Sequence, residues 1–174
     1  MLSPAAHGAP VHRAPALEVV VPDPTLAPDI AAGHVGLSVT DLDRSLAFYR
    51  DVLALELIQQ AAHDGHRFAF LGAGGRLFLT LWQQSADAFD PRRSGLHHLA
   101  LQVPTLDAVE AIEARLRARG LTPRYDGVVP HQEGADSAAL FFTDPDGIRL
   151  EVYSPTGAAG RAAPVAGAPS CGFF

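Results

Sequence analysis

Two stretches of the chain repeat one pattern of apolar and polar positions. HVGLSVTDLD begins at His34 and resembles HLALQVPTLD, which begins at His98, at an offset of 64 residues. Alternation with a period of two predicts a half-buried β-strand in each stretch. A capping residue and apolar positions at helical spacing then predict helices over residues 42–52 and 106–119. A strand followed by a helix is therefore predicted in each of the two stretches.

Further strands are predicted after each helix. FLGAGGRLFLTLW, from residue 70, approximately matches FFTDPDGIRLEVY, from residue 142, at an offset of 72 residues. This match places Leu79 at the position that corresponds to Glu151. Short segments rich in glycine and aspartate lie between the apolar runs and indicate tight turns. We therefore expect an α+β fold built from paired βαβββ modules that form an open cup.

Both ends of the chain differ in composition from its centre. The first residues and the last are rich in proline and alanine and carry little periodicity, which is typical of loosely held extensions. Cys171, near the end, is accordingly expected to have no role. The predicted division is an N-terminal extension over 1–30, a folded domain over 31–156 with modules at about 34–84 and 96–155, and a flexible C-terminal tail over 157–174.

The alternation also assigns side chains to faces. If apolar residues of each strand pack on the helices, then His34, His98 and Glu151 share the opposite face. Two imidazoles and one carboxylate form the facial triad that holds divalent ions with open coordination positions. Arg149 and Tyr153 lie on the same face as Glu151 and are expected to orient a substrate anion or hydroxyl.

Charge and composition exclude several classes of function. The formal net charge of -6 argues against nucleic-acid binding, and the absence of lysine excludes a Schiff-base or P-loop lysine. The single cysteine excludes an internal disulfide. No apolar run is long enough to span a bilayer, and no signal peptide is recognised. We therefore expect a soluble, cytoplasmic protein that acts on a small molecule.

Three segments resemble the vicinal oxygen chelate superfamily of glyoxalases, bleomycin-resistance proteins and extradiol dioxygenases. They are HVGLSVTDLDRSLAFYRDVLALELI, GLHHLALQV and DPDGIRLEVY. The resemblance implies paired βαβββ modules and a divalent metal held by His34, His98 and Glu151. Fe(II) is favoured, and Mn(II), Ni(II) and Zn(II) are alternatives. It also implies a homodimer, and in some members the first histidine and the other ligands come from different chains.

Departures from the family's sequence patterns reduce the number of activities that this chain is expected to have. Glyoxalase I has a further glutamate ligand, for which this chain has Leu79 by the repeat. Fosfomycin thiol transferases have a threonine where this chain has Gly36 and a tyrosine where it has Phe141. Extradiol dioxygenases keep three ligands and add a histidine and a tyrosine before the glutamate. The resemblance thus implies acid–base catalysis by His131 and a position for Phe141 at the substrate.

The first expectation is an Fe(II) ring-cleaving dioxygenase of the extradiol type, which chelates neighbouring oxygens of a small organic substrate. One alternative is a non-oxidative metal-dependent lyase, isomerase or transferase of the glyoxalase or fosfomycin-resistance type. The other is a non-catalytic protein that binds a drug or natural product, as bleomycin-resistance proteins do.

Overall fold

The computed structural model describes residues 32–173, and the predicted extension over 1–30 lies outside them. In the described residues, a strand, a helix and three further strands follow one another twice, as expected. The first module contains β1 (Val35–Val39), α1 (Leu42–Leu53), β2 (Glu56–His63), β3 (His66–Ala73) and β4 (Arg76–Gln83). The second contains β5 (Leu99–Gln102), α2 (Leu106–Ala118), β6 (Val129–Pro130), β7 (Ala138–Thr143) and β8 (Arg149–Ser154), and the 3-10 helix η1 (Ser170–Phe173) follows it.

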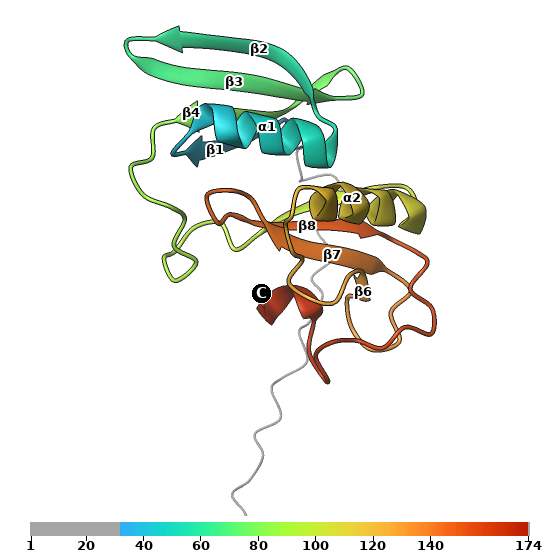
Figure 1. Cartoon of the computed structure of the whole chain (residues 1–174). Coiled ribbons are helices and arrows are strands. Elements are labelled where there is room, and N and C mark those ends of the chain that lie inside the picture. The colour runs from blue at the N-terminus through green and yellow to red at the C-terminus, as the bar shows by residue number, and fades with distance from the viewer. Residues whose placement is uncertain (1–31, 174) are drawn as a thin grey trace, which may run out of the picture. The chain divides into compact units, whose positions relative to one another are not determined.

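Each module forms its own four-stranded mixed sheet. The strand orders are β1-β4-β3-β2 and β5-β8-β7-β6, and in both sheets the first strand is parallel to its neighbour while the other pairs are antiparallel. Figure 1 shows one module above the other, with α1 and α2 beside each other. The α+β fold of paired βαβββ modules is therefore confirmed.

The two helices begin where the caps predict. Asp41 accepts a hydrogen bond from the backbone of Arg44 at 3.0 Å, and Thr105 accepts one from Ala108 at 3.3 Å. The helices end at Leu53 and Ala118, within one residue of the predicted ends. Neither helix has the length and apolar character needed to cross a membrane.

The helices and the inward faces of both sheets share one apolar core. α1 packs on β3 and β4, α2 packs on β7 and β8, and the helices contact each other. The residues that the alternation assigns to the helix side include Leu37, Val39, Leu150 and Val152, and all four are buried in this core. Tyr49 of α1 is also fully buried there. Hydrophobic burial thus fixes which side chains face away from the helices.

The turn between β7 and β8 also joins the modules through polar contacts. The hydroxyl of Tyr49 in α1 donates to Asp144 Oδ2 at 2.9 Å, and Asp144 Oδ1 accepts from the backbone of Asp146 and Ile148. Burial, followed by the charge of Asp144, raises the pKa of Tyr49 well above its ordinary value. Burial also raises the pKa of Asp144.

The strand register corrects the alignment of the two modules. Gly36 pairs with Thr80 just as Ala100 pairs with Glu151, so Thr80 and not Leu79 corresponds to Glu151. The predicted match was therefore one residue out of register. In a strand, such a slip assigns every side chain to the opposite face of the sheet. Leu79 is buried in the apolar core. Because a threonine brings no carboxylate, the first module still lacks the glutamate ligand of glyoxalase I.

The end of the chain contacts the second sheet, contrary to the flexible tail expected over 157–174. Ser170 has no exposed surface. Its backbone N–H donates to the carbonyl of His131 at 2.7 Å, and its hydroxyl donates to the carbonyl of Pro130 at 2.8 Å. The hydroxyl of Tyr125 donates to the carbonyl of Ser170 at 2.7 Å. These contacts hold η1 beside β6 and β7, as Figure 1 shows at the red end of the chain.

Candidate metal centre

Glu151 is a buried carboxylate on the face of the second sheet that points away from α2. Its neighbours in β8, Leu150 and Val152, lie in the core, so alternation turns Glu151 to the opposite face. The residue is only 3% exposed. Burial of a carboxylate is costly unless other groups pair with it. The carboxylate of Glu151 therefore needs neighbouring side chains that pair with it.

Two imidazoles lie within contact distance of this carboxylate. His98 Nε2 lies 3.2 Å from Glu151 Oε2, and His131 Nε2 lies 2.8 Å from Oε1. The other nitrogen of His131 lies 2.8 Å from the hydroxyl of Ser137. The structure thus brings together His98 and Glu151 as the alternation predicts, and adds His131 from the loop after β6.

His98 immediately precedes β5, where its ring is held at both nitrogens. Nδ1 lies 2.8 Å from His97 Nδ1, while Nε2 faces the carboxylate. Burial is the main cause that lowers the pKa of His98, although the charge of Glu151 opposes it. A lowered pKa favours the neutral imidazole, which is the form that binds metal ions.

Cys171 of η1 is the third member of the cluster. One ligand atom from each of His98, Glu151 and Cys171 lies within 4.8 Å of the others. Burial and the charge of Glu151 raise the pKa of the thiol. The prediction that Cys171 is incidental was therefore wrong about its surroundings. Local sequence held no signal for this contact, because it depends on where the end of the chain folds back.

The donor set fits a divalent metal ion. It combines an imidazole nitrogen, a carboxylate oxygen and a sulfur, each a common ligand type for first-row transition metals. His34 does not belong to this cluster within the described chain. It precedes β1 in the other sheet and is exposed. The single chain therefore brings together two of the three residues that the sequence analysis predicts as ligands.

The three predicted substrate residues differ in how far their side chains are exposed near the cluster. Tyr153 is partly exposed, donates from its hydroxyl to Gln102 at 3.0 Å and packs edge-on against the ring of His131. Arg149 is partly exposed as well. Phe141 pairs with Glu151 but is completely buried against Tyr125. Phe141 therefore lies beneath the surface of this face.

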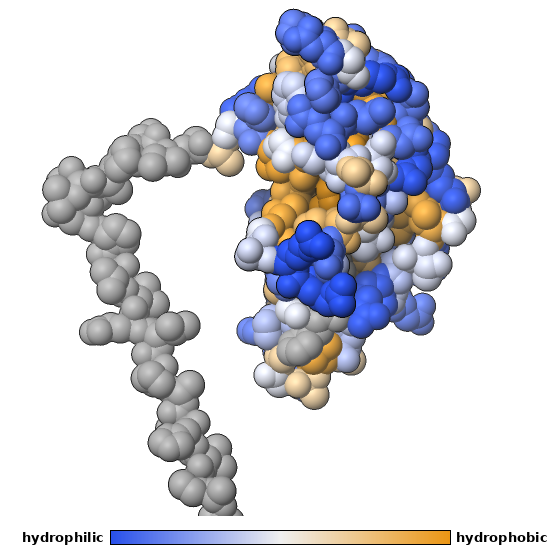
Figure 2. Space-filling view, turned by 90° about the vertical axis from the view of Figure 1, so that its left-hand side faces the viewer, coloured by the Kyte–Doolittle hydropathy of each residue, from blue (hydrophilic) through white to orange (hydrophobic). Residues whose placement is uncertain are grey.

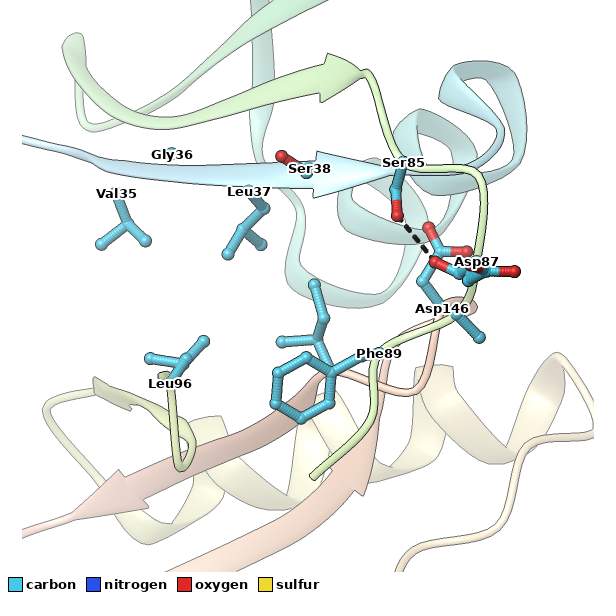
Figure 3. A pocket seen from close by; sticks show the side chains of 11 residues that line it. Val35, Gly36, Leu37, Ser38, Ser85, Asp87, Phe89, Leu96 and Asp146 are labelled. Carbon is cyan, nitrogen blue, oxygen red and sulfur yellow. Dashed lines mark hydrogen bonds between the residues drawn. The ribbon is translucent and has the colours of Figure 1, made fainter. Parts of the chain in front are cut away.

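A separate pocket of about 320 Å³ opens beside β1 (Figure 3). Val35 and Leu37 point from the strand toward Phe89 and Leu96 across the cavity. Figure 2 shows apolar side chains reaching the surface between the more polar upper and lower parts of the molecule. His98, Glu151 and Cys171 do not line this pocket, so its apolar walls and the titratable cluster are different places.

Comparisons with known proteins agree with this fold. A catechol-2,3-dioxygenase of Bacillus subtilis is 31% identical over 72% of this chain, which spans only 42% of that enzyme. A lactoylglutathione lyase of Neisseria meningitidis is 32% identical over 68% of this chain and 86% of its own length. The crystal structure of a glyoxylase/bleomycin resistance protein/dioxygenase domain from Frankia sp. EAN1pec is 30% identical, with a TM-score of 0.61 over 72% of this chain and 97% of that domain.

The family model matches residues 31–152, which include both modules and the residues His98 and Glu151. The resemblance predicted from the three sequence segments is thereby confirmed. The chain belongs to the Glyoxalase/Bleomycin resistance protein/Dioxygenase superfamily.

Proposed function

We propose that the protein is a metal-dependent enzyme that binds a small organic substrate through two neighbouring oxygen atoms. The observation that carries this proposal is the buried carboxylate of Glu151 between the imidazoles of His98 and His131. One relative, 26% identical over 70% of this chain, is named a manganese-dependent dioxygenase, which agrees with the donor types found here. A divalent ion held at such a site supplies a positive charge that polarises substrate oxygens.

His34 is proposed as the third ligand, contributed by a second copy of the chain. The residue is exposed at the start of β1 and lies outside the cluster of its own chain. An isologous homodimer can bring the exposed end of one β1 strand to the partner's second sheet. This arrangement completes the facial triad of two histidines and one carboxylate without changing the fold of either chain.

The first choice of reaction is ring cleavage of a catechol-type substrate with Fe(II). Arg149 and Tyr153 are partly exposed beside Glu151, where they can bind a substrate anion or hydroxyl. His131 is placed to hold or move a proton, because its Nε2 contacts Glu151 and its Nδ1 contacts a serine hydroxyl. The similarity to the catechol dioxygenase supports this choice over the part of that enzyme that the chain spans.

The test is anaerobic reconstitution with Fe(II), followed by measurement of bound iron and of oxygen uptake with a panel of catechols. We expect near one iron per chain and uptake with at least one catechol. Glu151→Gln should lose both, whereas His63→Gln, in the exposed β2–β3 hairpin, should keep both. Wild-type protein that retains no divalent ion under these conditions would overturn the proposal.

A non-oxidative lyase is the second candidate. It is favoured by the lactoylglutathione lyase, which matches this chain over most of its own length. Thr80 argues against it, because the first module provides no carboxylate at the position that corresponds to Glu151. Turnover of a thiol-adduct substrate without oxygen uptake would select this candidate over the dioxygenase. Recovery of every ligand unaltered would instead indicate a binding protein.

A further inference from the structure

The C-terminal helix η1 is held at a defined place on the second sheet. Ser170, fully buried, makes two hydrogen bonds to the backbone of Pro130 and His131 and accepts one from Tyr125. Three bonds on one residue fix the path of the residue that follows it. The position of Cys171 is therefore set by its neighbour and not by chance contact of a loose end.

Cys171 faces the same surface as Glu151. It packs with Tyr153 and Tyr125 against Phe141 and Ala139, on the side of the sheet opposite α2. Within the described residues, its sulfur joins His98 and Glu151 in the one group of three ligand-type side chains whose donor atoms approach within 4.8 Å. Ligands at about 2.0–2.3 Å from a zinc ion lie roughly 3.5 Å apart in a tetrahedral site. Side-chain movements on the order of 1 Å bring these three atoms to that spacing.

We propose that Cys171 is a metal ligand and supplies a thiolate to the centre that contains His98 and Glu151. This inference rests on the proposed metal centre but adds a sulfur donor from the end of the same chain. When the bond to the metal forms, the thiol proton leaves to solvent, as ligation by cysteine requires. The resulting nitrogen, oxygen and sulfur donors favour Zn(II), Co(II) or Fe(II) over the harder Mn(II).

Ligation by Cys171 also has a structural consequence. A bond from sulfur to the metal attaches η1 to the face that carries Glu151, in addition to the hydrogen bonds of Ser170. The end of the chain then covers the centre on one side. Metal binding should therefore reduce the exposure of Cys171 to reagents in solution.

The chain contains one cysteine, so every thiol signal reports on Cys171. We would load the 174-residue chain with Co(II) and record the near-ultraviolet charge-transfer absorption of a thiolate–cobalt bond. The rate of thiol alkylation would be measured with and without Zn(II). Cys171→Ala removes the sulfur, and His98→Ala serves as the matched variant that removes a proposed ligand but keeps the thiol.

We expect a charge-transfer band in the wild type that is absent in Cys171→Ala, and alkylation at least 10-fold slower with Zn(II). Cys171→Ala should weaken Zn(II) binding about 10-fold or more and Mn(II) binding much less. In His98→Ala, Zn(II) should protect the thiol less. If Co(II) binds without the band and Zn(II) leaves alkylation unchanged, the role of Cys171 is wrong while the metal centre stands. If the wild type binds no metal, both proposals fall.

Discussion

Nε2 of His131 lies 2.8 Å from Oε1 of Glu151, although the two residues are twenty positions apart in the chain. The loop after β6 brings the imidazole to the buried strand, and Ser137 engages its other nitrogen at 2.8 Å. A ring held at both nitrogens keeps a fixed orientation. His131 is therefore placed to orient the carboxylate of Glu151 in addition to any role in proton transfer.

The first prediction concerns this contact. Replacement of His131 by alanine should weaken divalent metal binding about 10- to 100-fold, because Glu151 loses the partner that orients it. A competition titration against a chelator measures the affinity. His66→Ala, which removes an exposed imidazole in the β2–β3 hairpin, should leave it unchanged. Equal affinities of the wild type and the His131 variant would contradict the orienting role.

The positions of His98 and Glu151 could be predicted from the sequence because they follow from strand alternation, a local property. Burial of Leu150 and Val152 in the core makes the face of Glu151 unambiguous. The correspondence of Leu79 to Glu151 was wrong because the two segments were matched one residue out of register: Phe70 pairs with Thr80 as Phe141 pairs with Glu151. Phe141 and Phe142 are both apolar, so the apolar pattern alone did not distinguish the two alignments. Thr80 takes that position.

The position of Cys171 could not be predicted for a different reason. Its contact with the centre depends on hydrogen bonds between Ser170 and a distant strand, and composition gives no information on such contacts. The composition of residues 157–174 is that of a loose tail, yet a buried serine attaches its end to the sheet. The position of Cys171 therefore depends on long-range packing, which the local sequence pattern does not reveal.

The second prediction tests whether His34 acts across a dimer. His34→Ala and Glu151→Gln should each abolish metal-dependent activity when pure. After the two are mixed and allowed to exchange subunits, about one quarter of the sites should combine unaltered residues from both chains and recover activity. Exchange would be verified with mass-tagged subunits. Complete exchange with no recovery would place all ligands within one chain.

The third prediction concerns the contact between the modules at Asp146. This carboxylate, 3% exposed, accepts hydrogen bonds from the backbone N–H and the hydroxyl of Thr40 and from Arg44. Asp146→Ala removes the acceptor from all three donors and should lower the free energy of unfolding by about 2–4 kcal/mol. Arg44 is about half exposed, so Arg44→Ala should cost roughly 1 kcal/mol or less. Urea unfolding measures both values.

A matched variant separates this effect from loss of surface charge. Asp90 pairs with Arg92 and Arg93 at the surface, where both arginines are largely exposed. Asp90→Ala should therefore leave the midpoint of urea unfolding nearly unchanged. If Asp90→Ala destabilises the protein as much as Asp146→Ala does, the contact between the modules contributes no more to stability than a surface ion pair.

The fourth prediction concerns Tyr49, whose hydroxyl donates to Asp144 between the modules. Tyr49→Phe removes that hydrogen bond and should lower the free energy of unfolding by about 2 kcal/mol near neutral pH. The loss should depend on pH, because burial and the charge of Asp144 raise the pKa of Tyr49 well above its ordinary value in the folded protein. The unfolded chain keeps the ordinary pKa of about 10.

The sign follows from which state releases the proton first. Below about pH 10 both states keep the phenol protonated, so the stabilising contribution of Tyr49 is fully present. Above it the unfolded state loses the proton while the folded state retains it, and the wild type loses up to about 1.4 kcal/mol per pH unit relative to Tyr49→Phe. Tyr125 and Tyr153 remain in both proteins, so their titration cancels in the difference. Urea unfolding from about pH 8 to 11 should therefore show the two stability curves converging; curves that stay parallel would mean that Tyr49 titrates alike in both states.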